Sequence, residues 1–340
     1  EPPKGEAGRW SGLTLGLPAT DSENPSYDIS NANKRNIAIN LKDPKGLEVM
    51  HDLLATANVF VTNNRTQALK KMGLDYETLS QKYPHLIWAQ INGYGDHGPA
   101  AANPGFDSVA FFARSGAMHD FADAASLYPI TPVIAFGDRT TACSLAAGIS
   151  AALYHQAKTG KGQKVQVSLY GQAIYNIGDV LQAVQYGDKY PKTRNAAVSP
   201  FVNAYECKDG KWVFIACLDY GRYAPVILKL IGRKDLVNDP RFVTIAAAKE
   251  HCEENIALVS EGFKQFTQDE WCEKLTEADV AFERVNQFED VIRDEQALVN
   301  GYVYPVEYKT GHKIYTVSSP VKFGDTIIPE HKLAASLGEN

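Results

Sequence analysis

Asp138 is the side chain whose place in the sequence best suits covalent chemistry. It follows Gly137 in the segment 135–141 and precedes a run rich in small residues. The pattern predicts that Asp138 opens a helix that continues to about Lys158. A helix start carries unpaired N–H groups and partial positive charge, so a fixed, ionised aspartate there can act as a nucleophile. The local sequence by itself favours a plainer role for Asp138, as the N-cap of the helix.

A second group of polar and basic residues follows the apolar segment 59–61, which we predict to be a strand. Asn63, Arg65, Lys70 and Lys71 cluster just beyond its end. In open α/β sheets phosphate groups bind outside the ends of strands, so this cluster could hold a phosphorylated ligand. The alternative for the two lysines is a solvated helix face, and the sequence leaves both open.

Other reactive residue types show no pattern of a site. The eight histidines have no ligand spacing, and the five cysteines contain no C-x-x-C pair. We therefore expect no metal site and no disulfide framework. Unpaired cysteines of this kind are typical of a reducing compartment, so we predict a cytoplasmic protein.

The composition limits the partners of the protein. The chain has 340 residues and a net charge of −6, with 44% hydrophobic and 22% charged residues. These values are typical of a globular protein with one large or two ordinary domains. The chain contains no long basic block and no apolar run of bilayer length. We therefore expect neither nucleic acid nor a membrane as a partner.

The first half of the chain alternates between strand and helix patterns. The predicted strands are 36–41, 59–61, 86–91 and 164–169. The predicted helices begin after Asp43, pass through 68–72, and cover 107–117, 138–158 and 171–186. This alternation is typical of an α/β fold with a doubly wound parallel sheet and helices on both faces.

The second half predicts a separate, inserted domain. We divide the chain into a large α/β domain over 1–186, a linker over 187–200, a smaller α+β domain over 201–298 and a segment over 299–340 that returns to the large domain. The small domain opens with two apolar runs on either side of Lys208-Asp209-Gly210, which predicts a β-hairpin.

Taken together, the motifs of this chain resemble those of the family III CoA-transferases, the CaiB/BaiF or formyl-CoA transferase family. The resemblance covers nearly the whole chain and rests on the order of the segments 33–41, 43–46, 53–59, 68–74, 92–95, 98–99, 104–107, 136–138 and 159–163. Details at 61–63, 105–107, 112–114 and 185–187 are most similar to the branch that acts on 2-hydroxy acids, such as 2-hydroxyisocaproate or phenyllactate CoA-transferases.

The resemblance implies a function and a set of site residues. Asp138 would attack the carbonyl of an acyl-CoA, and backbone amides near 137–140 would stabilise the oxyanion. By family position Asn63, Lys71 and Tyr94 would contact CoA, with Gly137 at the turn beside the nucleophile. The substrates would be acyl-CoA and small carboxylic acids, with no permanently bound cofactor. The family form is an interlocked homodimer.

The chain also departs from the family pattern. The resemblance implies that the large domain lacks an N-terminal strand and helix here, and that the end at Asn340 falls short of the family's last helices. No glycine-rich loop that would shield the active site is found. The related racemases carry a catalytic histidine where this chain has Phe106, beside Asp107, which we interpret as a structural hydrogen-bonding residue. The alternatives are a racemase or thioesterase on the same scaffold, or a non-catalytic CoA-binding subunit.

Overall fold

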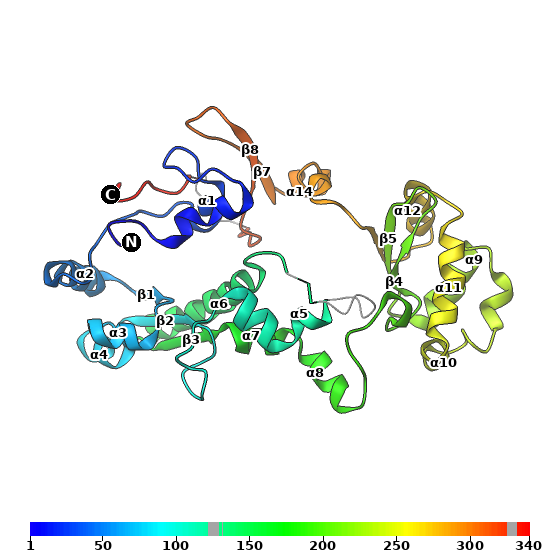
Figure 1. Ribbon diagram of the computed structural model, residues 1–340, viewed down its shortest axis with the longest axis horizontal. Coiled ribbons are helices and arrows are strands. Elements are labelled where there is room, and N and C mark those ends of the chain that lie inside the picture. Colours follow the sequence, from blue (N-terminus) through cyan, green and yellow to red (C-terminus); the bar gives the residue numbers. More distant parts are fainter. Residues whose placement is uncertain (122–128, 131, 325–331) are drawn as a thin grey trace. The chain divides into compact units, whose positions relative to one another are not determined.

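The computed structural model describes residues 1–121, 129–130, 132–324 and 332–340. The chain divides into two compact units, and Figure 1 labels the helices and strands in their order along the chain. Unit 1 consists of Glu1–Ala89, Ala151–Lys164 and Asn286–Asn340, and unit 2 consists of Gln90–Ser150 and Val165–Val285. The domain boundaries at 186, 200 and 298 stay a prediction.

A three-stranded sheet forms the centre of the α/β part. Its strand order is β1 (Val59–Thr62), β2 (Ile87–Asn92) and β3 (Lys164–Ser168). The helices that connect these strands are α3 (Thr66–Met72) and α4 (Tyr76–Lys82) between β1 and β2, and η2 (Asp107–Ala113), α5 (Ala117–Asp120) and α6 (Phe136–Thr159) between β2 and β3. Neighbouring parallel strands need such helical crossovers. The predicted α/β class and the three strands at 59–61, 86–91 and 164–169 are confirmed.

In unit 1 the helix predicted after Asp43 is α2 (Pro44–Thr56), and the Asp43 side chain accepts a hydrogen bond from the Lys45 N–H at 2.9 Å. Helix α3 is followed by its C-cap, Gly73, which has a left-handed φ of 66°. Buried side chains of these helices pack around Trp88, whose indole N–H donates to the Leu74 carbonyl at 3.0 Å.

The strand predicted at 36–41 is wrong. Residues 35–40 have no regular secondary structure. This segment instead bonds to the two chain ends. The Glu1 amino group donates to the Ile37 carbonyl and the Ile39 N–H donates to the Glu1 carbonyl, both at 2.8 Å, and the Asn340 N–H donates to the Asn36 carbonyl at 3.0 Å.

Two predicted helices differ from the structure in their form. The helix expected over 107–117 is a π-helix, η2, that ends at Ala113 and is followed by the short helix α5. The helix expected over 171–186 is broken at Ile177 into α7 (Leu169–Asn176) and α8 (Gly178–Gln185).

The α+β part of unit 2 forms its own sheet and core. Strands β4 (Val202–Glu206) and β5 (Trp212–Ala216) pair antiparallel, with Tyr205 opposite Val213. This confirms the predicted hairpin, and Gly210 in its turn has a φ of 77°. A third strand, β6 (Phe282–Arg284), pairs antiparallel with β5. Its helices are α9 (Tyr220–Leu230), η4 (Lys234–Asn238), α10 (Ile245–Glu250), α11 (Cys252–Phe263) and α12 (Gln268–Glu277).

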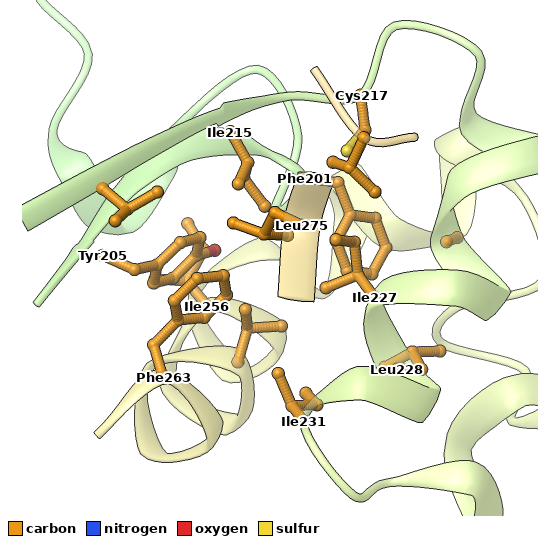
Figure 2. Packing of buried hydrophobic residues seen from close by; sticks show 14 of the residues in the cluster. Phe201, Tyr205, Ile215, Cys217, Ile227, Leu228, Ile231, Ile256, Phe263 and Leu275 are labelled. Carbon is orange, nitrogen blue, oxygen red and sulfur yellow. The ribbon is translucent and has the colours of Figure 1, made fainter. Parts of the chain in front are cut away.

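The core of this part is built from the inner face of the hairpin and the apolar faces of the helices. Figure 2 shows Tyr205 and Ile215 from the strands facing Ile227, Ile256 and Phe263 from the helices. Phe263 stacks between the rings of Tyr205 and Trp271, with centroid distances of 4.8 and 4.4 Å.

The remaining elements lie before α2, between α8 and β4, and after β6. They are η1 (Ala7–Leu15), α1 (Pro25–Asn31), η3 (Arg194–Ala196), α13 (Phe288–Val291), α14 (Glu295–Val299), β7 (Val303–Glu307) and β8 (Lys313–Val317). Strands β7 and β8 pair antiparallel, with Val303 opposite Val317. Among the residues described, no helix has both the length and the apolar character that crossing a membrane requires.

Candidate active site

Asp138 lies in the first turn of α6 but is not its N-cap. The helix begins at Phe136, so Asp138 is its third residue, and Ala135 before it has a φ of 60°. The N-cap interpretation of Asp138 is therefore wrong. The side chain of Asp138 is exposed, and the preceding Gly137 is buried.

Asp107, from the first residue of the π-helix η2, holds the start of α6. The Asp138 N–H donates to Asp107 Oδ1 at 3.2 Å. Burial raises the pKa of Asp107 overall, and backbone hydrogen bonds from Gly137 and Ala135 offset part of this shift. A carboxylate that accepts hydrogen bonds from the free N–H groups of a helix start caps that helix, even when it comes from a distant part of the sequence. This geometry supports the interpretation of Asp107 as a structural hydrogen-bonding residue.

Gly137 is a glycine because the two helices approach closely there. A Cβ at this position would lie 2.4 Å from Asp107 Oδ1 and 2.4 Å from Cγ of Phe111. The absence of a side chain lets the Asp107 carboxylate reach the first turn of α6. After Gly137, the hydroxyls of Thr140 and Thr141 both donate to its carbonyl, at 2.9 and 2.7 Å.

The two carboxylates at this helix start influence each other. Surrounding protein atoms desolvate Asp138 and raise its pKa, the negative charge of Asp107 raises it further, and Arg139 opposes both effects. Burial also raises the pKa of Asp107, against the hydrogen bonds that lower it. Asp138 therefore holds its proton more tightly than a free aspartate, which makes its carboxylate a better nucleophile once it is ionised.

Two of the backbone amides expected to stabilise an oxyanion are occupied. The Asp138 N–H is bound by Asp107, and the Arg139 N–H donates to the Ala135 carbonyl at 3.0 Å. The role of the other amides near 137–140 stays a prediction, and these two are not free to act as oxyanion donors. The sequence could not show it, because the partner of the Asp138 amide lies 31 residues away.

Tyr94 lies in unit 2 together with Asp107, Gly137 and Asp138. It is half-buried and packs against a buried cluster that includes Phe111, the residue beside Gly137. Gly93 and Gly105 bring the ends of the Tyr94 loop together, since a Cβ on Gly105 would lie 2.5 Å from Cα of Gly93. Tyr94 and Asp138 are thus connected through one packed group of side chains.

Asn63 and Lys71 lie in unit 1. Asn63 directly follows β1, and Lys71 lies in the last turn of α3; both are exposed. The contact of these residues with CoA stays a prediction. Phe111 and Phe112 are 3% and 1% exposed and belong to the buried core.

The part of the chain that the structure describes contains no group of three or more His, Cys, Asp or Glu side chains that could hold a metal ion. All five cysteines are free, and four of them are buried.

Comparisons with known proteins agree on one family. The family model described as CoA-transferase family III matches residues 1–340. The (R)-2-hydroxy-4-methylpentanoate CoA-transferase of Clostridioides difficile is 39% identical over 340 residues, which are 100% of this chain and 85% of that protein. The cinnamoyl-CoA:phenyllactate CoA-transferase of Clostridium sporogenes is 39% identical over 344 residues, covering 100% of this chain and 83% of that protein.

A solved structure shares the fold. The crystal structure of a CAIB/BAIF family protein from Brucella suis has a TM-score of 0.80 and 26% identity to this chain. The match covers 100% of this chain and 88% of that one.

Proposed function

The chain belongs to CoA-transferase family III, and from that premise we propose that it moves CoA from an acyl-CoA to a free 2-hydroxy acid, with Asp138 as the covalent carrier. It is an enzyme that uses CoA thioesters as substrates. The choice of a 2-hydroxy acid is supported by the names of the two relatives that are 39% identical to it.

In the proposed reaction Asp138 carries first an acyl group and then CoA. A carboxylate oxygen of Asp138 attacks the thioester carbonyl, and the CoA thiolate leaves, which forms an acyl-aspartyl anhydride. The thiolate then attacks the Asp138 carbonyl carbon and releases the donor acid, so that an aspartyl-CoA thioester remains. The carboxylate of the acceptor acid reverses the two steps and frees Asp138 with the new acyl-CoA as product.

One observation carries this proposal: the backbone of Asp138 is fixed while the residue stays exposed, although nearby protein atoms partly desolvate its carboxylate. Asp107 binds the Asp138 N–H, and Gly137 allows the close approach that this bond needs. A nucleophile positioned in this way does not lose orientational freedom at the moment of attack. Because the anhydride would hydrolyse in water, the full site must exclude solvent when substrate is bound.

We further propose Asn63, Lys71, Tyr94 and Gly137 as residues of the CoA site. CoA serves there as a substrate, with no permanently bound cofactor. Phe106, which is 68% exposed, has no group that can transfer a proton, and this argues against α-proton exchange as the activity.

We also propose that the protein is a cytoplasmic homodimer with interlocked chains. Free cysteines support a reducing compartment. Two large aromatic side chains, Tyr175 and Tyr186, are 84% and 91% exposed, which supports a second copy that covers them.

The decisive experiment replaces Asp138. Asp138→Asn should reduce the rate of CoA exchange between an acyl-CoA and 2-hydroxy-4-methylpentanoate by a factor on the order of 10³ or more, because the amide cannot form the anhydride. Hydroxylamine trapping followed by mass spectrometry should label Asp138 in the wild type and nothing in the variant.

The matched control is Asp179→Asn, which changes an exposed carboxylate in the first turn of α8 and should leave the rate unchanged. Turnover retained in Asp138→Asn would contradict the proposal. Fast hydrolysis of acyl-CoA without any acceptor would instead indicate a thioesterase, and CoA binding without labelling would indicate a non-catalytic subunit.

A further inference from the structure

Arg114 in unit 2 lies over two tyrosine rings. It follows the π-helix η2 directly, and its guanidinium carbon lies 5.2 Å from the ring centroid of Tyr94 and 5.3 Å from that of Tyr170. Both distances are within the range of a cation–π interaction. We refer to Arg114, Tyr94 and Tyr170 as the Arg114 clamp.

The two rings are fixed relative to each other by the backbone. Tyr94 lies in the turn after β2, and Tyr170 is the second residue of α7. The Tyr170 N–H donates to the carbonyl of Gly93, the residue before Tyr94, at 3.0 Å. The clamp therefore joins three separate segments, two of which are linked by this backbone hydrogen bond.

Contact with two aromatic faces leaves the edge of the guanidinium open. Arg114 is exposed, and within the described residues its side chain has no hydrogen bond and no carboxylate at ion-pair distance. Arg233, Arg241 and Arg284, by contrast, each pair with a nearby aspartate. The five N–H donors of a guanidinium lie in its plane and match the two oxygens of a carboxylate or phosphate.

From this geometry we infer that the Arg114 clamp binds an oxyanion of the substrates, either the carboxylate of the acceptor acid or a phosphate of CoA. The inference rests on the proposed function, in which Tyr94 contacts CoA. Stacking orders the arginine before the ligand arrives, so that little side-chain entropy is lost on binding. Tyr94 also packs against the cluster that contains Phe111, and Phe111 contacts Gly137 beside the nucleophile.

The reaction gives a reason for such a cation. The acceptor acid enters as an anion while Asp138 is held as an uncharged thioester. Asp107 contributes a negative charge at the same helix start. A guanidinium with an open edge offsets the repulsion that the incoming carboxylate meets, or anchors CoA through its phosphates.

The test compares Arg114→Gln and Arg114→Lys with the wild type in steady-state CoA transfer. Arg114→Gln should raise the KM of one substrate by roughly tenfold or more, as expected for the loss of a charge-assisted hydrogen-bonded pair, while kcat changes little. Arg114→Lys should restore only part of the loss, because an ammonium group has no planar pair of donors. Arg293→Gln, an exposed arginine after α13, is the matched control and should behave as the wild type.

Two arms separate the sources of the oxyanion. If Arg114→Gln raises the KM for acyl-CoA but not the KM for an acyl-pantetheine, which has no phosphate, the clamp binds a phosphate of CoA. A raised KM for 2-hydroxy-4-methylpentanoate assigns it to the acceptor carboxylate. If both KM values stay as in the wild type, or if kcat falls with KM unchanged, the inference is overturned.

The proposed function can fail separately. If the wild type shows no CoA transfer, calorimetric titration with CoA and with 2-hydroxy-4-methylpentanoate still tests the clamp. Weaker binding of either probe to folded Arg114→Gln than to Arg293→Gln supports the inference, and equal binding of both probes overturns it. Thermal unfolding of each variant shows whether weaker binding is due to misfolding. If Arg114→Gln is misfolded, the binding of Arg114→Lys is compared with that of Arg293→Gln instead.

Discussion

At the scale of the residue, the two aspartates at the start of α6 have different settings. Asp107 is bound by backbone N–H groups, whereas the Asp138 carboxylate has no hydrogen bond of its own among the described residues. Each carboxylate is negative and raises the cost of ionising its neighbour. The pair therefore combines a fixed helix cap with an accessible group whose pKa lies above the usual range of aspartate.

This pairing predicts a pH effect. Asp138 must be ionised to attack, so the rate of its acylation should fall as the pH drops through its raised pKa. Asp107→Asn keeps an oxygen that can accept the Asp138 N–H but removes the like charge. The pKa of Asp138 should then decrease, and the acid limb of the pH–rate profile should move to lower pH.

Single-turnover acylation with excess enzyme, measured over a range of pH, reports this limb directly. Asp179→Asn, a charge removal on α8, controls for the general change in net charge. An acid limb that moves to higher pH, or stays where it was, in Asp107→Asn would show that Asp107 does not act on Asp138 through its charge.

The sequence indicated Asp138 but not what fixes it. A glycine followed by an aspartate before a helical pattern is a local signal, and it identified the segment. The position of Asp107 against Gly137 depends on the packing of η2 on α6, and no spacing along the chain encodes that contact. For the same reason Arg114 had no recognisable signal, since its two rings come from segments 20 or more residues distant in sequence.

At the scale of the element, the packing of α6 against η2 requires a glycine, Gly137, at the second position of α6. Gly137→Ala should destabilise the protein by about 1–3 kcal/mol, because the new Cβ would lie 2.4 Å from both Asp107 and Phe111. The shift needed to relieve this overlap also moves Asp138, so CoA transfer should slow. Chemical denaturation and the steady-state assay measure the two effects.

Gly178→Ala provides the control at the start of another helix. A Cβ at Gly178 meets no atom within 4 Å, so this change should be neutral or slightly stabilising. Wild-type stability and activity in Gly137→Ala would contradict the close approach of η2 and α6.

The sequence predicted helices and strands correctly where the local residue pattern favours the same element that the packing of the fold requires. Short apolar runs at 59–61 and 86–91 became β1 and β2, and the hairpin around Gly210 formed as expected. The segment 36–41 also alternates, but alternation reports only burial on one side. A strand needs a continuous ladder as well, and the described long-range backbone bonds of this segment reach only Glu1 and Asn340 at the two chain ends.

At the scale of the whole molecule, the surface predicts association. Tyr175 and Tyr186 would leave large apolar areas in water in a monomer, at 84% and 91% exposure. Sedimentation velocity should therefore find a dimer, and Tyr186→Ser should weaken it. A monomer at assay concentrations, with full CoA transfer, would contradict both the dimer and its relevance to activity.

Gly93 and Gly105 have a practical consequence for protein engineering. Because the backbones of Gly93 and Gly105 approach closely, the two ends of the loop between them lie side by side. Its tip at His97, Gly98 and Pro99 is exposed. A fluorophore or affinity peptide inserted at that tip would lengthen the loop without separating Gly93 from Gly105. A fluorophore there would also lie in the same loop as Tyr94, where we propose that CoA binds, and could report substrate binding.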